Sequence, residues 1–328
     1  MKETEEKKSQ QEYPIRRVVI TGPTGAIGTA LIRLCISEGI QVTAVVRPDT
    51  KRLDRIQADP LVQVVRLGIE NISKLPTVQE IRGNYDVFFH LAWAGTFGDT
   101  RNDTVVQYNN IGYSLQAAQA AKALGCHTFI GAGSQAEYGR TEKKLKDTTP
   151  VNPENGYGIA KLCAGQMTRL VCGQLGMRHI WTRILSVYGP VDGEKTLINS
   201  LLASLLEGKQ VETTKGEQIW DYLYCDDAAK ALLMLAKNGL DKKTYCIGSG
   251  QGRQLKSYLE EAAKVVAKVS TKEEKDLLNL IEFGKRSYGE NQVMHLVADI
   301  SELTKDTGFK PEISFAEGIE KTVQWLQG

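Results

Sequence analysis

Short runs of β-branched and aromatic residues alternate with helical patterns over the first 190 residues. Six runs have the length and composition of buried strands, and they cover 16–21, 41–47, 62–67, 85–92, 127–134 and 179–189. Between them, 26–39 places apolar residues at helical spacing, and 116–125 does the same with small residues. Strands that alternate with helices are typical of a parallel sheet covered by helices on both faces. The pattern therefore predicts an α/β fold, a Rossmann-like doubly wound parallel sheet.

The regular alternation of predicted strands and helices ends at Pro190. A helical stretch around Leu197 to Leu206 is followed by a strand-like run at 220–225, a helix at 227–239, a strand at 245–250 and longer helices. We expect a main domain over 14–190, completed by return strands within 218–250, and a smaller α/β region over 191–328. The polar segment 1–13 is predicted to be a disordered tail.

Composition narrows the function classes. The 41 basic and 39 acidic side chains give a formal charge of +2, so nothing favours a nucleic-acid partner. No apolar run is long enough for a bilayer, and the mixed-charge start of the chain lacks the apolar stretch of a signal peptide, so we expect a cytoplasmic protein without a membrane partner. The six cysteines are scattered without CxxC spacing, which favours buried thiols over disulfides and predicts no metal site.

A glycine-rich turn follows the first predicted strand and opens the first predicted helix. It reads TGPTGAIG, and the expected cofactor contacts are Thr21, Gly22, Thr24, Gly25, Ala26, Ile27 and Gly28. Glycine lets the backbone approach a pyrophosphate, whose charge is stabilised by free amides and the helix dipole. The spacing is GxxGxxG rather than GxGxxG, and a plain tight turn is the alternative. The flanking strand and helix favour a dinucleotide site.

Arg47 ends the second predicted strand, where a residue facing the adenosine ribose is expected. A carboxylate there binds the 2′-hydroxyl of NAD, whereas an arginine pairs with a 2′-phosphate. Arg47 therefore favours NADP(H), and NAD(H) stays open because Asp49 is close. The alternative is a solvated arginine at a strand end.

Tyr157 and Lys161 are spaced to share one face of a helix, and Ser134 ends a predicted strand about two dozen residues upstream. Ligands of open α/β folds bind at the carboxyl edge of the sheet, where Ser134 is expected. Tyrosine titrates near pH ~10, so a neighbouring ammonium is needed before its phenolate can act as a base near neutrality. The three residues together are predicted to be catalytic; the alternative is a buried tyrosine, a surface lysine and a turn serine.

Nearly the whole chain resembles the extended short-chain dehydrogenase/reductase superfamily, and within it the enzymes that modify nucleotide-diphosphate sugars. Besides the motifs above, the resemblance rests on HLA at 90–92, on Asn109, and on the segments 183–190, 220–229 and 247–250. It implies that Leu91, Ala92 and Asn109 lie at the cofactor. It also implies that Tyr157 exchanges a proton with the sugar, that Lys161 holds the nicotinamide ribose, and that Ser134 hydrogen-bonds the reacting oxygen.

Two departures from the family pattern narrow the reaction. Sugar-nucleotide 4,6-dehydratases of this family carry an Asp-Glu pair directly after the position of Ser134, and this chain has Gln135 and Ala136. Glu137 follows, but on an extended segment its side chain points away. Dehydration is therefore not expected. Epimerases of the family commonly hold NAD through an acidic residue after the second strand, where this chain has Arg47, so we expect NADPH-dependent reduction of a 4-keto-6-deoxy sugar nucleotide. An NAD-dependent nucleotide-sugar 4-epimerase and a non-catalytic NADP(H)-sensing or scaffold protein are the alternatives.

The substrate side also departs from the family, which often has arginine at the position of Trp220 and asparagine at that of Ser186. Another cation is then needed for the diphosphate, and Arg286 and Arg253 are the candidates. Tyr288 and Trp93 are candidate stacking partners, and Gln135 is a further substrate contact. The resemblance also implies a homodimer built on the helices that carry Asn109 and Tyr157.

Overall fold

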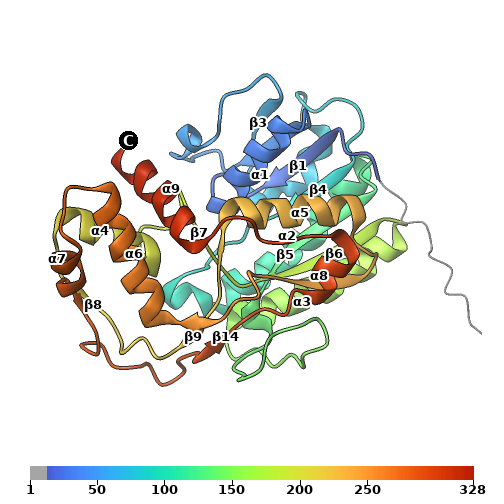
Figure 1. Ribbon diagram of the computed structural model, residues 1–328. Helices are drawn as coiled ribbons and strands as arrows, with labels where there is room; N and C mark the ends of the chain where they lie inside the picture. Colours follow the sequence, from blue (N-terminus) through green and yellow to red (C-terminus); the bar gives the residue numbers. More distant parts are fainter. Residues whose placement is uncertain (1–12) are drawn as a thin grey trace, which may run out of the picture.

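The computed structural model describes residues 13–328, and its centre is a sheet of seven parallel strands in the order β11-β6-β5-β4-β1-β2-β3. In chain order the strands are β1 (Arg17–Thr21), β2 (Gln41–Val46), β3 (Val62–Arg66), β4 (Val87–His90), β5 (Thr128–Ser134), β6 (Arg178–Ile184) and β11 (Lys243–Ile247). The Rossmann-like parallel sheet expected from the sequence is therefore confirmed (Figure 1). The tail expected over 1–13 lies, apart from Tyr13, outside the described residues.

Helices cover both faces of this sheet (Figure 1). On one face α1 (Ala26–Ser37) packs against α5 (Cys225–Asn238), and on the other α2 (Thr104–Ala123) packs against α3 (Gly156–Gln174). Side chains alternate along a strand, so Val18 and Ile20 of β1 join the apolar cluster of α1 and α5, whereas Val19 joins that of α2 and α3. Burial of both faces explains why the strands are almost continuously apolar.

The expected single strand over 179–189 is wrong. The chain leaves the main sheet at Leu185, whose backbone N–H donates to the carbonyl oxygen of Ile247, and continues as the separate strand β7 (Ser186–Tyr188). β7 pairs in parallel with β10 (Tyr222–Tyr224). An uninterrupted apolar run carries no signal for this change of partner, because both halves are equally suited to a strand.

Small sheets and helices form the rest of the carboxyl-terminal part. β9 (Ile219–Trp220) lies between β12 (Arg253–Gln254) and β14 (His295–Leu296), and β8 (Val211–Glu212) pairs with β13 (Ile281–Glu282). The helices are α4 (Leu197–Glu207), α6 (Leu255–Val269), α7 (Glu274–Asn279), α8 (Ser301–Thr307) and α9 (Phe315–Gln327). α6 contacts α4, α7 and α9, and these helices gather beside the main sheet (Figure 1).

Four 3₁₀ helices complete the described elements: Leu53–Arg55, Ile69–Thr77, Gly98–Arg101 and Gln135–Glu137. Within residues 13–328, no helix combines the length and apolarity that a bilayer crossing requires.

Candidate active site

The glycine turn is held in a shape that only glycine permits. Gly22 has a φ of 71°, and a Cβ atom there would lie 2.8 Å from the backbone nitrogen of Ala92. A Cβ atom on Gly28 would overlap the carbonyl oxygen of Gly22. The turn therefore packs tightly against the segment that follows β4, and the start of α1 packs against the turn.

The start of α1 offers unpaired amides to a ligand. Gly25 precedes the helix without a side-chain cap, and the first turn holds no acidic residue. A cavity of about 220 Å³ opens here, lined by Gly22, Gly25, Ala26, Ile27, Gly28, Leu91, Ala132, Ile184, Val187 and Asp192. Free amides and the positive end of the helix dipole suit a pyrophosphate, so these residues fit a dinucleotide.

Thr21 belongs to the scaffold behind this turn. Its hydroxyl lies 3.1 Å from Nδ1 of His90 and accepts the backbone N–H of Ala92 at 3.3 Å. Nε2 of His90 lies 3.1 Å from the hydroxyl of Ser114 on α2. Burial lowers the pKa of His90 to about 3, with a smaller contribution from the charge of Lys161, so the imidazole is neutral and structural.

The other predicted cofactor residues have simpler surroundings. Arg47 follows β2 directly and is exposed, and its guanidinium makes no ion pair within residues 13–328. Thr24 is half-buried in the turn. Asn109 is half-buried on α2, whereas its neighbour Asn110 is buried and exchanges two hydrogen bonds with the backbone of Ala94.

Ser134 and Tyr157 come together because α3 packs closely on the 3₁₀ helix Gln135–Glu137. The side chain of Asn155 caps α3 by accepting the N–H of Gly158 at 2.8 Å. A Cβ atom on Gly158 would overlap the carbonyl oxygen of Ala136, so only glycine permits this approach. Ser134 ends β5, and its side chain and that of Tyr157 line one cavity.

Lys161 lies one helical turn beyond Tyr157 and is buried. Its Nζ donates to the carbonyl oxygen of Ala132 at 2.5 Å and lies 3.7 Å from the centre of the Trp93 ring. Burial lowers the pKa of Lys161 to about 7, and the charge of Glu137 opposes that shift. The ammonium is therefore poised to lose its proton near neutrality.

The phenol of Tyr157 is held in its neutral form in the free protein. Desolvation raises its pKa, and the neighbouring hydroxyl of Ser134 and the charge of Arg101 act in the opposite direction. A positively charged ligand beside the ring is needed to favour the phenolate further. The neutral phenol is the form that can donate a proton.

Glu137 is buried away from the cavity, although the segment that carries it is a 3₁₀ helix and not the extended chain expected from the sequence. One carboxylate oxygen accepts the N–H of Ser134 at 2.8 Å and the indole N–H of Trp181 at 3.0 Å. The other pairs with Nε of Arg183 at 2.7 Å. Glu137 therefore holds the backbone of Ser134 in place by this hydrogen bond.

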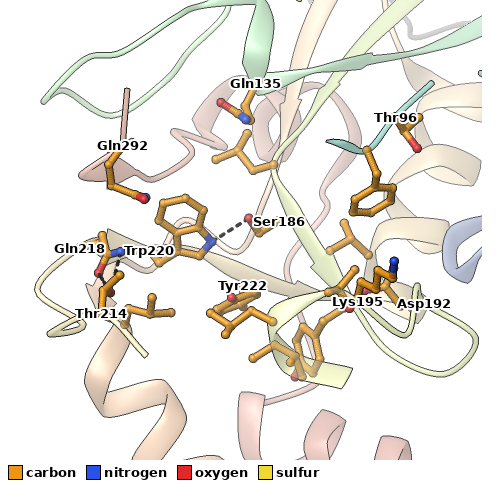
Figure 2. A pocket seen from close by; sticks show the side chains of 18 of the residues that line it. Thr96, Gln135, Ser186, Asp192, Lys195, Thr214, Gln218, Trp220, Tyr222 and Gln292 are labelled. Atoms are coloured by element: carbon orange, nitrogen blue, oxygen red, sulfur yellow. Dashed lines mark hydrogen bonds between the residues drawn. The ribbon is translucent and has the colours of Figure 1, made fainter. Parts of the chain in front are cut away.

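A larger cavity of about 640 Å³ adjoins the glycine turn, sharing Ile184, Val187 and Asp192 with the smaller one. Its walls come from the main sheet and from the carboxyl-terminal elements (Figure 2). Four predicted substrate residues line it: Gln135, Ser186, Trp220 and Arg286. Figure 2 shows the indole of Trp220 inside the cavity with its N–H directed at Ser186.

Three predicted substrate residues are not among those that line this cavity. Arg253 forms an ion pair with Glu261 at 2.7 Å beside a different cavity. The hydroxyl of Tyr288 lies 3.2 Å from a carboxylate oxygen of Glu217. Trp93 stands edge-on to Tyr157 and covers Lys161.

Sequence reasoning missed the residues that hold the loop after β4. Gln107 accepts the indole N–H of Trp93 at 2.9 Å and donates to the carbonyl oxygens of Gly95 and Thr100 at 2.8 and 2.9 Å. Asn110 holds Ala94 one helical turn later. The sequence does not single out these two amides, because the same helix carries others at Asn109, Gln116 and Gln119.

Comparisons with known proteins agree with this geometry. The model of the "NAD dependent epimerase/dehydratase family" matches residues 18–248. A CDP-abequose synthase from Salmonella typhimurium is 24% identical over 94% of this chain and 98% of its own length.

Solved structures share the fold of this chain. A UDP-N-acetylglucosamine 4-epimerase from Methanobrevibacter ruminantium superimposes with a TM-score of 0.83 at 21% identity, covering 95% of this chain and 98% of that one. A dTDP-glucose 4,6-dehydratase from Streptomyces venezuelae with NAD bound gives 0.80 at 19% identity, covering 95% and 97%. The glycine turn, the catalytic candidates and these matches place the chain in the NAD-dependent epimerase/dehydratase family of the extended short-chain dehydrogenase/reductase superfamily.

Proposed function

We propose that this chain reduces a 4-keto-6-deoxy sugar nucleotide with NADPH, with Tyr157 as the proton donor. The observation that carries the proposal is the set of groups around Ser134. Gln135 lines the large cavity and Ala136 is buried, so neither position supplies the acid and base that elimination of water requires. The nearest carboxylate along the chain, Glu137, is buried against Arg183. Proton exchange through Tyr157 remains as the chemistry of the cavity.

The preference for NADPH rests on Arg47. It stands directly after β2, where the adenosine ribose of a dinucleotide lies in this type of fold, and its exposed guanidinium is free to pair with a 2′-phosphate. Lys51 and Arg52 add positive charge nearby in the sequence and are also exposed.

In this mechanism the chain positions the reacting groups and moves one proton. The bound nicotinamide supplies the hydride. Ser134 donates a hydrogen bond to the ketone oxygen, and Tyr157 delivers its proton to that oxygen as negative charge develops. The ammonium of Lys161 stabilises the resulting phenolate until it is reprotonated. We also propose that residues 191–328 bind the nucleotide part, since Trp220 and Arg286 line the cavity from this region.

A 4-epimerase is the second candidate, because it needs the same proton exchange through a residue placed like Tyr157. An epimerase keeps its cofactor through each cycle, because the ketone that it forms is reduced again by the same nicotinamide. The two candidates therefore differ in whether reduced cofactor is consumed.

The test has two arms. In the first, purified protein receives NADPH or NADH with a panel of nucleotide-linked 4-keto-6-deoxy sugars, and the loss of reduced cofactor is followed. In the second, it receives NAD⁺ with nucleotide sugars that carry a C4 hydroxyl, because only these have a configuration at C4 that an epimerase can invert. We expect turnover with NADPH that Tyr157→Phe abolishes. Interconversion of sugars in the second arm, without loss of NADPH in the first, identifies the epimerase. Tight NADPH binding without any sugar conversion identifies the sensor or scaffold protein.

We also propose a homodimer built on α2 and α3. Large apolar side chains on these helices are exposed: Val105, Tyr108, Ile159, Met167 and Leu170. The small residues of α2, by contrast, are buried inside the subunit at Ala117, Ala118, Ala120 and Ala121. Sedimentation should show a dimer that Leu170→Asp dissociates, whereas Leu240→Asp, which replaces an exposed leucine outside these helices, should leave it intact.

A further inference from the structure

An arginine that belongs to no recognised motif lies on the ring of Tyr157. Cζ of Arg101 is 4.4 Å from the centre of that ring, within the range of a cation–π contact. Arg101, Tyr157 and Ser134 line the same cavity. The guanidinium therefore lies beside the proposed proton donor, at the wall of the same cavity.

The position of Arg101 is built into the fold. Its guanidinium donates to the carbonyl oxygen of Thr96 at 3.3 Å, and the preceding carbonyl, that of Thr100, is held by Gln107. The next residue, Asn102, accepts the N–H of Gly156 at 2.9 Å, which ties the loop to the first residue of α3. The same helix carries Tyr157, so arginine and tyrosine are fixed relative to one another.

Four groups on separate elements set the charge around Tyr157. Arg101 ends the 3₁₀ helix Gly98–Arg101, Ser134 ends β5, Glu137 belongs to the 3₁₀ helix that follows β5, and Lys161 belongs to α3 itself. Nζ of Lys161 is 5.7 Å from the centre of the tyrosine ring. Burial brings the pKa of Lys161 to about 7, so this lysine is only partly charged near neutrality, whereas an arginine stays charged.

We propose, resting on the proposed function, that Arg101 is a positioning residue which orients the ring of Tyr157 and stabilises its phenolate with a permanent positive charge. Arg101 and Lys161 then both stabilise the phenolate of Tyr157. The proton that leaves Tyr157 for the substrate oxygen leaves a negative charge under the guanidinium, and the attraction between these two charges favours the transfer. Proton return to Tyr157 from water restores the starting state.

The test is a titration of Tyr157 that needs no turnover. Protein labelled with ¹³C at the tyrosine Cζ is titrated by NMR with saturating NADP⁺, and the Tyr157 signal is assigned from Tyr157→Phe. Arg101→Met keeps an unbranched aliphatic side chain but removes the guanidinium and its charge, and it should move the midpoint of Tyr157 upward by about one pH unit or more. Arg101→Lys, which keeps the charge, should recover part of that shift. Coincident curves for wild type and Arg101→Met, including curves that are both flat, overturn the proposal.

Steady-state kinetics supply the second readout. In the reductive direction Tyr157 must be protonated, so the rate falls as pH rises through its pKa, and Arg101→Met should move that limb to higher pH while lowering kcat. A rise in KM alone with an unmoved limb shows a substrate contact and overturns the proposal. Arg140→Met, at an exposed arginine paired with Glu154, is the matched control and should change neither readout. An enzyme that consumes no NADPH refutes the proposed function, whereas the NMR titration still decides the role of Arg101.

Discussion

The indole N–H of Trp220 donates a hydrogen bond of 2.8 Å to the hydroxyl of Ser186 inside the large cavity (Figure 2). The two residues come from β9 and β7, which belong to different small sheets. They are also the two positions at which the sequence departs from the pattern of related enzymes on the substrate side. The structure shows that these departures form one unit, in which the polar atom of each side chain satisfies the other.

This pairing predicts a coupling between the two positions. Trp220→Phe and Ser186→Ala should each destabilise the protein, and the double variant should lose less than the sum by about 1 kcal/mol, because the second change removes a group that has already lost its partner. Urea unfolding of the four proteins measures the coupling. Strictly additive losses would show that the hydrogen bond contributes nothing.

The glycine turn predicts different outcomes at two neighbouring glycines. Gly28→Ala should lower the free energy of unfolding by about 1–3 kcal/mol, because the new methyl group overlaps the carbonyl oxygen of Gly22. Gly25 is extended at a φ of −88°, and a methyl group there meets only the Gly22 oxygen at 3.9 Å. Gly25→Ala should therefore keep its stability but bind cofactor less tightly, since Gly25 lines the smaller cavity. Thermal unfolding measures the stability of each variant, and fluorescence titration with NADPH measures its affinity for the cofactor. Equal stability of the two variants would contradict the predicted clash at Gly28.

The buried ion pair of Glu137 and Arg183 predicts a large loss of stability when it is broken. Glu137→Gln leaves the guanidinium buried without its counter-charge, and NH1 of Arg183 already has no hydrogen-bond partner within residues 13–328. We expect a loss of about 3 kcal/mol in urea unfolding. Glu154→Gln, which breaks an exposed pair, should cost about 1 kcal/mol or less. Similar losses of stability for Glu137→Gln and Glu154→Gln would contradict the prediction that the buried ion pair matters more than the exposed one.

Lys161 predicts a dependence of stability on pH. Its pKa is about 7 in the folded protein and lies below the value of 10.5 for a free lysine, so the unfolded chain binds more protons between these values. Stability from this group therefore rises with pH above about 7. Lys161→Met removes the contribution, so it should be more stable than wild type, and this margin should shrink from about pH 7 to pH 8.5, at a rate that approaches about 1.4 kcal/mol per pH unit. A difference in stability between the two proteins that stays constant with pH would contradict the lowered pKa of Lys161.

The sequence predicted most of the fold because its strands are buried on both faces and therefore read as apolar runs. It did not predict the break at Leu185, since the apolar run continues through it while the hydrogen-bonding partner changes from the main sheet to β10. The order of Ser134, Tyr157 and Lys161 could be found because each falls at a strand end or on a helix face. Arg101 could not, because it ends a short 3₁₀ helix whose position depends on contacts with Gln107 and Gly156.

Only some of the substrate residues predicted in the carboxyl-terminal part line the large cavity, and the reason is related. Arg286 and Trp220 line the large cavity, whereas Arg253 pairs with Glu261 and Tyr288 lies against Glu217. All four have residue types that suit a nucleotide. Which of them reaches the cavity is decided by the small sheets of two and three strands, whose two- and three-residue strands give almost no periodic signal.

The stoichiometry of cofactor and sugar tests the central claim most directly. Purified protein is mixed with limiting NADPH and an excess of the nucleotide-linked 4-keto-6-deoxy sugar that turns over, and both products are quantified by chromatography. The account predicts one sugar reduced for each NADPH oxidised, and neither product with Tyr157→Phe. Many sugars converted for each NADPH oxidised, or sugar conversion that survives Tyr157→Phe, would contradict it.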